Sequence, residues 1–360
     1  MAPFPLDTIL LGNSIELLDN LPEKSVDLIF ADPPYNLQLR GELWRPNLTR
    51  VNAVDDSWDQ FASFKEYDDF THQWLVACRR VLKDDGAIWV IGTYHNIYRI
   101  GRVLQDIGYW ILNDLVWIKN NPMPNFRGTR FTNAHETLIW ASKTPTAKYT
   151  FHYQVMKSLN DDLQMRSDWY LPICTGPERL KENCQKAHST QKPESILYRI
   201  LLATTNPGDI ILDPFFGTGT TGAVPKKLGR HWIGIEQREE YVQLAQRRID
   251  DIIPLPMSEI TLDFQNAKHQ NKRIPFGTLL ESGMLSPGQK IFFGKERKLA
   301  AVIRADGRLI LDGATGSIHT LARKLLGGKP CNGWDYWYVE IDSDLKSIDT
   351  LRQEIRNKFK

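Results

Sequence analysis

Residues 26–35, VDLIFADPPY, decide the fold. Val26–Ala31 is a short apolar run typical of a buried parallel strand, and it leads directly into Asp32, two prolines and Tyr35. Similar apolar runs follow along the chain at Ala87–Gly92, Asp209–Leu212 and Trp232–Ile235. The run that ends at Leu212 also leads into an acidic residue, in the segment DPFFGTGT over 213–220. We therefore predict that two buried strands are each followed by a carboxylate, Asp32 or Asp213, that is available for function.

Helical patterns alternate with these runs. The clearest is 64–82, where apolar residues recur at helical spacing and form one core-facing stripe: Phe64, Tyr67, Phe70, Trp74, Cys78, Val81 and Leu82. Thr220–Leu228 and Glu239–Ile253 also have helical patterns. Strands alternating with helices predict an α/β fold with a doubly wound, mostly parallel sheet.

The pattern of apolar and polar residues changes toward the C-terminus. Residues 255–275 lose periodicity and are predicted to be a linker between a large domain, 1–254, and a small α+β module, 276–360. In the module we predict a hairpin over 300–311, a helix over 317–326, a strand over 334–340 and a helix over 347–359. In the large domain, the polar segments 37–60 and 118–133 are long enough to be functional loops.

Charge and composition limit the function classes. Residues 255–360 carry 17 Lys and Arg against 12 Asp and Glu, whereas 1–254 carry 28 against 31, so a basic module on a near-neutral body mildly favours a polyanionic partner. The four cysteines form no CxxC or His-Cys cluster, which indicates neither a zinc site nor a disulfide framework. No segment approaches the ~18 apolar residues of a membrane span, and no basic leader precedes the first apolar run. We expect a cytoplasmic protein with no metal and no membrane partner.

The segment after Leu212 has the features of a cofactor loop. Gly217 and Gly219 permit a tight turn and close approach of a ligand, and Asp213 is suited to a ligand ammonium. Glu236 closes the next strand, where a carboxylate typically binds ribose hydroxyls. The third glycine of a dinucleotide fingerprint and the GK[ST] of a phosphate loop are missing, so a nucleoside joined to an amino acid, S-adenosylmethionine, fits better than NAD or ATP. A plain structural turn is the alternative.

The segment after Ala31 suits a different task. Methylation of an exocyclic amine requires the nitrogen lone pair, which is delocalised into the ring, to point at the methyl carbon. The Asp32 carboxylate and the Pro33 carbonyl are suited to accept the two N–H bonds, and consecutive prolines fix the direction of that carbonyl. Tyr35 offers a face on which a base can stack. A proline turn without function is the alternative.

These motifs resemble a known family. DPPY at 32–35, HSTQKPE at 188–194 and FFGTGTT at 215–221 resemble the amino-methyltransferases of DNA, and the catalytic motif preceding the cofactor motif resembles their circularly permuted β class. The stretches LPEKSVDLIFADPPYNLQL, NPMPNFRGTRFTNAHETLIWASK and CNGWDYW further resemble the cell-cycle-regulated, CcrM type of adenine methyltransferase. That resemblance covers nearly the whole chain. It implies N6 methylation of adenine in GANTC, S-adenosylmethionine as cofactor, double-stranded DNA as partner and a homodimer.

The resemblance assigns the site residue by residue. Its catalytic set is Asp32, Pro33, Pro34 and Tyr35. Its cofactor-binding set is Asn13, Thr190, Gln191, Lys192, Asp213, Phe216, Gly217, Gly219 and Glu236. The chain departs from the family at Asn13, where Asp is more usual, and at Ser189, which replaces a proline.

An adenine inside a duplex must be flipped out to reach such a pocket. Segment 117–131 interleaves basic and aromatic residues without an acid, and with the loop after DPPY it supplies candidate DNA contacts: Leu39, Leu43, Arg45, Asn121, Asn125, Arg127 and Arg130. In the C-terminal module the candidates are Ser317, Asn332, Trp334 and Arg352. A solvated charged loop and, for Trp334, Tyr336 and Trp337, a place in the core of the module remain alternatives. His135 and Glu136 are expected to orient neighbouring loops.

Three rival functions remain open. An N4-cytosine methyltransferase of the same fold more often has Ser where this chain has Asp32. RNA and protein-glutamine methyltransferases use a related Pro-Pro-Tyr cluster, but the basic loop and the extra module favour DNA. A catalytically silent DNA-binding protein conflicts with an intact segment 32–35.

Overall fold

A computed structural model describes residues 4–37, 57–125, 128–160, 163–182, 185–187, 190–256, 274–342 and 344–358. The chain divides into two compact units, 1–265 and 266–360. This division falls inside the predicted linker 255–275, of which residues 257–273 lie outside the described residues.

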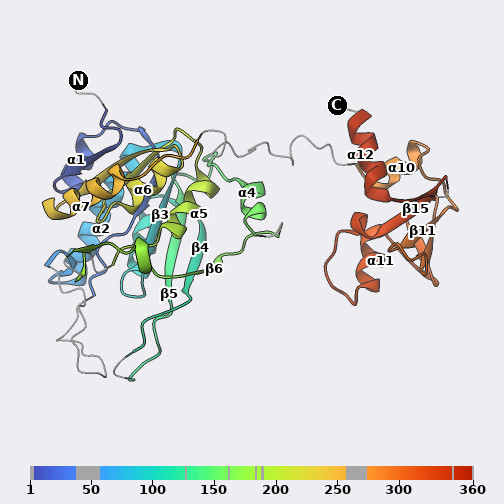
Figure 1. Cartoon of the computed structure of the whole chain (residues 1–360), viewed down its shortest axis with the longest axis horizontal. Coiled ribbons are helices and arrows are strands. Elements are labelled where there is room, and N and C mark those ends of the chain that lie inside the picture. Colours follow the sequence, from blue (N-terminus) through green and yellow to red (C-terminus); the bar gives the residue numbers. More distant parts are fainter. Residues whose placement is uncertain are drawn as a thin grey trace. The chain divides into compact units, whose positions relative to one another are not determined.

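The first unit is built on an eight-stranded sheet in the order β1-β10-β9-β2-β3-β5-β4-β6. Figure 1 shows β3, β4, β5 and β6 side by side in this sheet. The pairs from β1 to β3 are all parallel, whereas β5 runs antiparallel to both β3 and β4. The strands are β1 Thr8–Leu11, β2 Val26–Ala31, β3 Leu82–Gly92, β4 Trp110–Lys119, β5 His135–Ser142, β6 Asp168–Leu171, β9 Ile210–Asp213 and β10 His231–Glu236.

Helices cover both faces of the sheet, because successive strand side chains point to opposite faces. On one face, Ile29 and Val90 pack in a core with residues of α1, α2 and α3. On the other, Leu28 and Trp89 pack with residues of α5 and α6. The helices are α1 Ser14–Asn20, α2 Phe64–Val81, α3 Ile97–Asp106, α4 Tyr153–Ser158, α5 Glu194–Thr204, α6 Thr220–Lys227 and α7 Glu239–Asp250, with short helices η1 Ser57–Asp59 and η2 Gly176–Glu178 and a small pair of strands, β7 Lys181–Glu182 and β8 Gln185–Lys186. The predicted doubly wound, mostly parallel α/β sheet is confirmed.

The predicted elements of this unit are present, most with small shifts of their ends, but β3 begins at Leu82, five residues before the predicted start at Ala87. The predicted strands match β2, β3, β9 and β10, and the predicted helices match α2, α6 and α7. The stripe predicted for 64–82 is buried except for Phe70, which is half-buried, and for Phe64 at its start, which is 49% exposed and packs under the Arg99 guanidinium. Placing Phe64 in the core was therefore wrong, because it stands on the first, open turn of α2.

The second unit is a six-stranded antiparallel sheet with helices, in the order β14-β13-β12-β11-β15-β16. Its elements are α10 Phe276–Glu281, β11 Lys290–Phe293, β12 Ala300–Ile303, β13 Leu309–Leu311, β14 Ala314–Gly316, α11 Ile318–Leu325, η3 Gly333–Asp335, β15 Trp337–Ile341, β16 Asp344–Ser347 and α12 Ile348–Lys358. The predicted hairpin is β12–β13, and the predicted helices are α11 and α12.

The strand predicted over 334–340 begins later than expected. Trp334 lies in the short helix η3, and the strand begins at Trp337. Trp337 is fully buried and its indole N–H donates to the Ile318 carbonyl (2.9 Å). The question left open for Trp337 is thus settled in favour of the core of the module.

Among the described residues, no helix is long and apolar enough to cross a membrane. The same residues contain no group of three or more His, Cys, Asp or Glu side chains arranged to hold a metal ion.

One glycine limits the packing of the sheet. A Cβ added at Gly234 in β10 would lie 2.3 Å from the ring of Phe216, which stacks on Trp232. We expect Gly234→Ala to lower the free energy of unfolding by about 1–3 kcal/mol, because the ring must leave its stack. The measurement is the urea unfolding midpoint.

The matched control is Gly277→Ala in α10, where an added Cβ meets nothing within 4 Å. This change should leave stability unaltered or raise it slightly, because alanine favours a helix. Equal stability of the Gly234→Ala variant and the parent protein would contradict the packing described here.

Candidate cofactor and catalytic site

Four neighbouring parallel strands end at the same edge of the sheet, and each end carries a polar side chain. Asn13 follows β1, Glu236 ends β10, Asp213 ends β9 and Asp32 follows β2. Because β9 pairs with both β10 and β2, the ends of these three strands are adjacent. Ligands of open α/β sheets bind in the crevice beyond such carboxyl ends.

A cavity of about 370 Å³ lies at this edge. Its size is in the range of small-molecule sites. All four predicted catalytic residues line it, and so do these predicted cofactor residues: Asn13, Thr190, Gln191, Lys192, Asp213, Phe216, Gly217 and Glu236. Gly219 is not among the lining residues; it is the N-cap of α6 with φ 75°, and an added Cβ would lie 2.8 Å from Ala245.

Asp213 is a buried carboxylate that accepts two hydrogen bonds. Its Oδ1 accepts from the Phe215 N–H (2.8 Å) and its Oδ2 from the Thr221 hydroxyl (2.6 Å). Burial raises the pKa of Asp213 to about 7, more than these hydrogen bonds lower it. Among the described residues, no lysine or arginine forms an ion pair with it. A ligand ammonium would supply the missing positive charge, so the Asp213 carboxylate fits the amino group of an amino-acid moiety.

Glu236 joins the end of β10 to the glycine loop that follows β9 through a hydrogen bond to Gly217. Its Oε2 accepts from the Gly217 N–H (2.8 Å) and its Oε1 from the Arg238 N–H (2.9 Å). Burial raises the pKa of Glu236 despite these bonds. Each carboxylate oxygen keeps a further lone pair, which suits the paired hydroxyls of a ribose.

The other predicted cofactor residues also have roles in the protein itself. Asn13 is the N-cap of α1, its Oδ1 accepting from the Ile15 N–H (2.9 Å). The Gln191 side chain joins its segment to a neighbouring turn by accepting from the Leu180 N–H (3.0 Å) and donating to the Glu178 carbonyl (2.8 Å). These contacts place the side chains at the cavity wall, and their contact with a cofactor stays a prediction.

The two prolines after Asp32 present their carbonyls differently. The Pro34 carbonyl accepts from the Tyr67 hydroxyl (2.8 Å) and from the Asn96 amide (3.4 Å). The Pro33 carbonyl accepts no hydrogen bond from any of the described residues, and Pro33 lines the cavity. The acceptor that the sequence predicts for an amine is therefore available, while its neighbour is held by the core.

Asp59 holds the backbone that follows the prolines. Its Oδ1 accepts from the amides of Tyr35 and Asn36 (2.8 Å to Asn36), and its Oδ2 accepts from the Leu37 amide (3.0 Å). Asp59 is 3% exposed, so this three-amide anchor is shielded from water. The sequence placed Asp59 only within a polar loop, and an isolated acid in such a loop gives no signal of this role.

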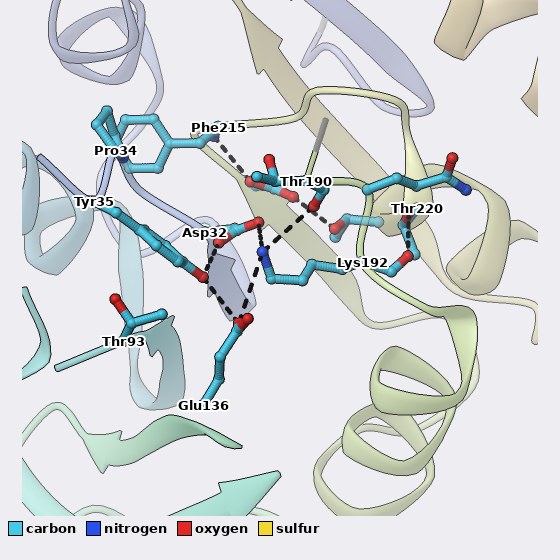
Figure 2. Close-up of polar contacts among 12 residues, drawn as sticks. Asp32, Pro34, Tyr35, Thr93, Glu136, Thr190, Lys192, Phe215 and Thr220 are labelled. Carbon is cyan, nitrogen blue, oxygen red and sulfur yellow. Dashed lines mark hydrogen bonds and ion pairs between the residues drawn. The ribbon is translucent and has the colours of Figure 1, made fainter. Parts of the chain in front are cut away.

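Asp32 is at the centre of a cluster of buried polar groups, shown in Figure 2. Its Oδ2 lies 2.6 Å from the ammonium of Lys192, and its Oδ1 lies 2.9 Å from the Tyr35 hydroxyl. The same hydroxyl is 3.1 Å from Glu136 Oε2, so its single proton serves one of two carboxylates at a time. Lys119 completes the cluster at 2.7 Å from Glu136 Oε1.

Strand pairing explains why Glu136 belongs to the site. Because β5 is antiparallel to β3 and β4, its first residues lie beside the last residues of both, and Trp117 pairs with Glu136. His135 and Glu136 were expected to orient loops, whereas both lie on β5, and Glu136 contacts Tyr35, one of the predicted catalytic residues. Lys119, which we assigned to a basic loop, ends β4 and is paired with Glu136.

The cluster balances two carboxylates against two ammonium groups. Burial raises the pKa of Asp32 more than Lys192 lowers it. For Glu136 burial acts in the same direction, but Lys192 and Lys119 together hold its pKa below the ordinary value. Burial opposes the charge of Lys192, yet Asp32 and Glu136 raise its pKa. Glu136 and Lys192 are therefore charged at neutral pH.

The candidate DNA contacts of the first unit fall partly outside the described residues, as Leu39, Leu43, Arg45 and Arg127 do. Arg130 is exposed and donates to the Tyr94 hydroxyl (2.6 Å). Asn121 accepts from the Ile173 amide (3.2 Å), and Asn125 is half-buried. Phe131 is fully exposed. Exposed aromatic and basic side chains thus occur together here, and their contact with DNA stays a prediction.

In the second unit, the candidate DNA contacts are engaged with one another or with the fold. Ser317 is the N-cap of α11, accepting from the Thr320 amide (3.1 Å), and the Asn332 amide donates to Asp335 (3.0 Å). Trp334 is 5% exposed, with the Arg352 guanidinium 4.3 Å from its ring centre. The structure places Trp334 in the core of the module, and contact of these four residues with DNA stays a prediction.

The fold and the cavity are those of an open α/β protein with a site suited to a nucleoside joined to an amino acid, and comparison with known proteins specifies the family. Residues 26–247 match the family model for DNA methylases of the N6/N4 type, and residues 258–360 match the model described as Restriction Enzyme Adenine Methylase Associated. The Type II methyltransferase M.HinfI of Haemophilus influenzae is 48% identical over 354 residues, 98% of each chain. M2.LlaDCHI of Lactococcus lactis subsp. cremoris is 43% identical over 66% of this chain and 87% of its own.

Solved structures agree at the level of the fold. A complex of M1.HpyAVI with S-adenosylmethionine has a TM-score of 0.51 and 27% identity, covering 68% of this chain and 98% of that one. The PvuII DNA methyltransferase, which is cytosine-N4-specific, has a TM-score of 0.54 and 23% identity, covering 72% and 91%. The chain belongs to the N6/N4 family of site-specific DNA methyltransferases, whose cofactor is S-adenosylmethionine.

If Asp213 pairs with the cofactor ammonium as predicted, cofactor binding is sensitive to pH. Below about pH 7 its carboxyl group is protonated in the free protein, whereas a cofactor ammonium favours the ionised form. The affinity for S-adenosylmethionine should therefore fall by up to about tenfold per pH unit as the pH drops below 7, and level off above it. Equilibrium binding measured by calorimetry over about pH 5.5–8.5 checks this.

Asp213→Asn is the matched variant. It should bind the cofactor more weakly than the parent protein at high pH and lose the dependence near pH 7, since the amide does not titrate. A parent affinity that stays constant across this range would show that Asp213 does not pair with the ammonium.

Proposed function

We propose that this protein transfers a methyl group from S-adenosylmethionine to N6 of an adenine flipped out of duplex DNA, within the sequence GANTC. The observation that carries the proposal is the pair of acceptors at the end of β2. Asp32 and Pro33 line the same cavity as the predicted cofactor residues, and the Pro34 carbonyl, unlike that of Pro33, accepts a hydrogen bond from Tyr67.

The bound cofactor supplies an electrophilic methyl group. The chain's part is to hold the acceptor nitrogen. Asp32 and the Pro33 carbonyl accept the two N–H bonds of the exocyclic amine, which turns its lone pair out of conjugation and toward the methyl carbon. Such fixed acceptors act in a site shielded from water, where they stabilise the positive charge that develops on nitrogen. The methylated amine then sheds a proton readily.

Several features support adenine as the base. Asp32 occupies a position where N4-cytosine enzymes more often have Ser, as judged from the resemblance to the family. The family model matched by the second unit is named for adenine methylases.

Flipping the base out of the duplex costs a few kcal/mol, which stacking of the base and contacts to the phosphates offset. Tyr35, which is 9% exposed and lines the cavity, is the proposed stacking partner.

The recognition sequence and the assembly are proposed from the resemblance to the CcrM type. GANTC is nearly palindromic, and a homodimer provides two copies of the contact residues for its two strands. We propose that the second unit reads part of the site, with Arg352 and Asn332 as contacts, and that the segment carrying Asn121, Asn125 and Arg130 contributes from the first unit.

The test uses tritiated S-adenosylmethionine and two duplexes, one with a single GANTC and one with GAATTG in its place. We expect N6-methyladenine in the first duplex only, identified by nucleoside analysis. Asp32→Ala should lower the rate by a factor of 100 or more, on the order of the loss when one electrostatic catalyst is removed.

Each other outcome has a defined meaning. Label in both duplexes would keep the chemistry and reject GANTC. N4-methylcytosine would reject adenine as the base. Tight, sequence-specific binding without methyl transfer would indicate a catalytically silent DNA-binding protein.

A further inference from the structure

The base-free site contains a conflict at Asp32. Lys192 places its ammonium 2.6 Å from Asp32 Oδ2, on the carboxylate that the target amine needs. Methyl transfer moves positive charge onto the amine nitrogen, and an ammonium bound to the same carboxylate opposes that charge. The side chain of Lys192 is 7% exposed, so water screens this repulsion only weakly.

Glu136 lies where it can take this ammonium. Its Oε2 is 3.9 Å from Lys192 Nζ, so a movement of about 1 Å brings the two to hydrogen-bond distance. Figure 2 shows Lys192 with dashed lines to both carboxylates and the Tyr35 hydroxyl between them. Glu136 is held in place by Lys119 at 2.7 Å on its other oxygen and by its position on β5.

From this geometry we propose that Glu136 is a positioning residue that accepts Lys192 from Asp32 when the target amine enters. The inference rests on the proposed function, because it assumes that Asp32 receives an exocyclic amine. Before the base arrives, Lys192 neutralises Asp32. Once the amine is bound, Lys192 is neutralised by Glu136 instead, and the cluster keeps two positive and two negative groups throughout.

Neighbouring contacts limit alternative roles for Glu136. Both of its oxygens already have partners, Lys119 at Oε1 and Tyr35 at Oε2, and it is linked to Asp32 through Tyr35 and Lys192. These contacts favour exchange of a partner over direct attack on the substrate. The Tyr35 hydroxyl, within reach of both carboxylates, remains paired with one of them in either arrangement.

The experiment compares Glu136→Gln with the parent protein on a duplex that the parent methylates. The amide keeps the shape and an acceptor for Tyr35, but it gives the displaced ammonium no counter-charge. We expect the single-turnover methylation rate to fall about tenfold or more, because a buried charge is left without its partner. The control is Glu23→Gln, an exposed carboxylate in the turn before β2 that does not line the cavity, which should methylate at the parent rate.

A second duplex separates this role from simple support of the fold. It carries 2-aminopurine, which has no 6-amino group, in place of the target adenine, so its entry does not require the Lys192 contact to Asp32 to break. Glu136→Gln should bind this duplex, and raise its fluorescence on flipping, as the parent protein does. A purely structural role would impair the response to 2-aminopurine along with methylation.

A double-mutant cycle with Lys192→Met completes the test. If Glu136 acts by receiving Lys192, then Glu136→Gln should have little further effect on the rate in the Lys192→Met protein. Full additivity of the two changes would overturn the inference, and so would a parent-like rate in the single variant Glu136→Gln. If the parent protein makes no N6-methyladenine at all, the proposed function fails, whereas an active parent with an unaffected Glu136→Gln variant rejects this inference alone.

Discussion

The pairing of β2 with β9 is the constraint on which the site depends. Leu28 and Ile29 of β2 lie in register with Ile211 and Leu212 of β9, so the strands end together and place Asp32 beside Asp213. Three other parts of the cavity wall meet at this edge of the sheet. They are the glycine turn after β9, the Glu236 carboxylate at the end of β10, and the segment 190–192 that carries Lys192. A sheet wound in this way brings Asp213, which we propose binds the cofactor, and Asp32, which we propose holds the substrate amine, into one cavity, although they are far apart in the chain.

The polar cluster shows how such a cavity remains stable when no base is bound. Buried carboxylates are costly unless they are paired, and here Asp32 and Glu136 are balanced by Lys192 and Lys119. Asp213 is not balanced in this way, and burial raises its pKa to about 7, so it remains the natural partner of a cationic ligand. The site thus has one part in which carboxylates and ammonium groups are paired, around Asp32, and one part with an unpaired carboxylate, Asp213, which we propose pairs with the cofactor ammonium.

Much of this arrangement follows from local sequence patterns. Continuous apolar runs identified β2, β3, β9 and β10, because strands buried on both faces need no polar alternation. The strands β4 and β5 were not predicted, since polar residues interrupt WILNDLVWIK and segment 135–142 was considered for its His-Glu pair alone. Glu136 and Lys119 therefore could not be placed at the site, as their position depends on antiparallel pairing between distant segments. Asp59 was missed for a related reason, because its partners are backbone amides, which sequence patterns do not reveal.

The most direct test of the account is a crystal structure of the protein with a GANTC duplex and a cofactor analogue that cannot transfer its methyl group. The account predicts the target adenine outside the helix, with its N6 about 3 Å from both an Asp32 carboxylate oxygen and the Pro33 carbonyl. A base that lies in the cavity with its amine directed away from these two acceptors would contradict the central claim, and so would a cytosine in its place.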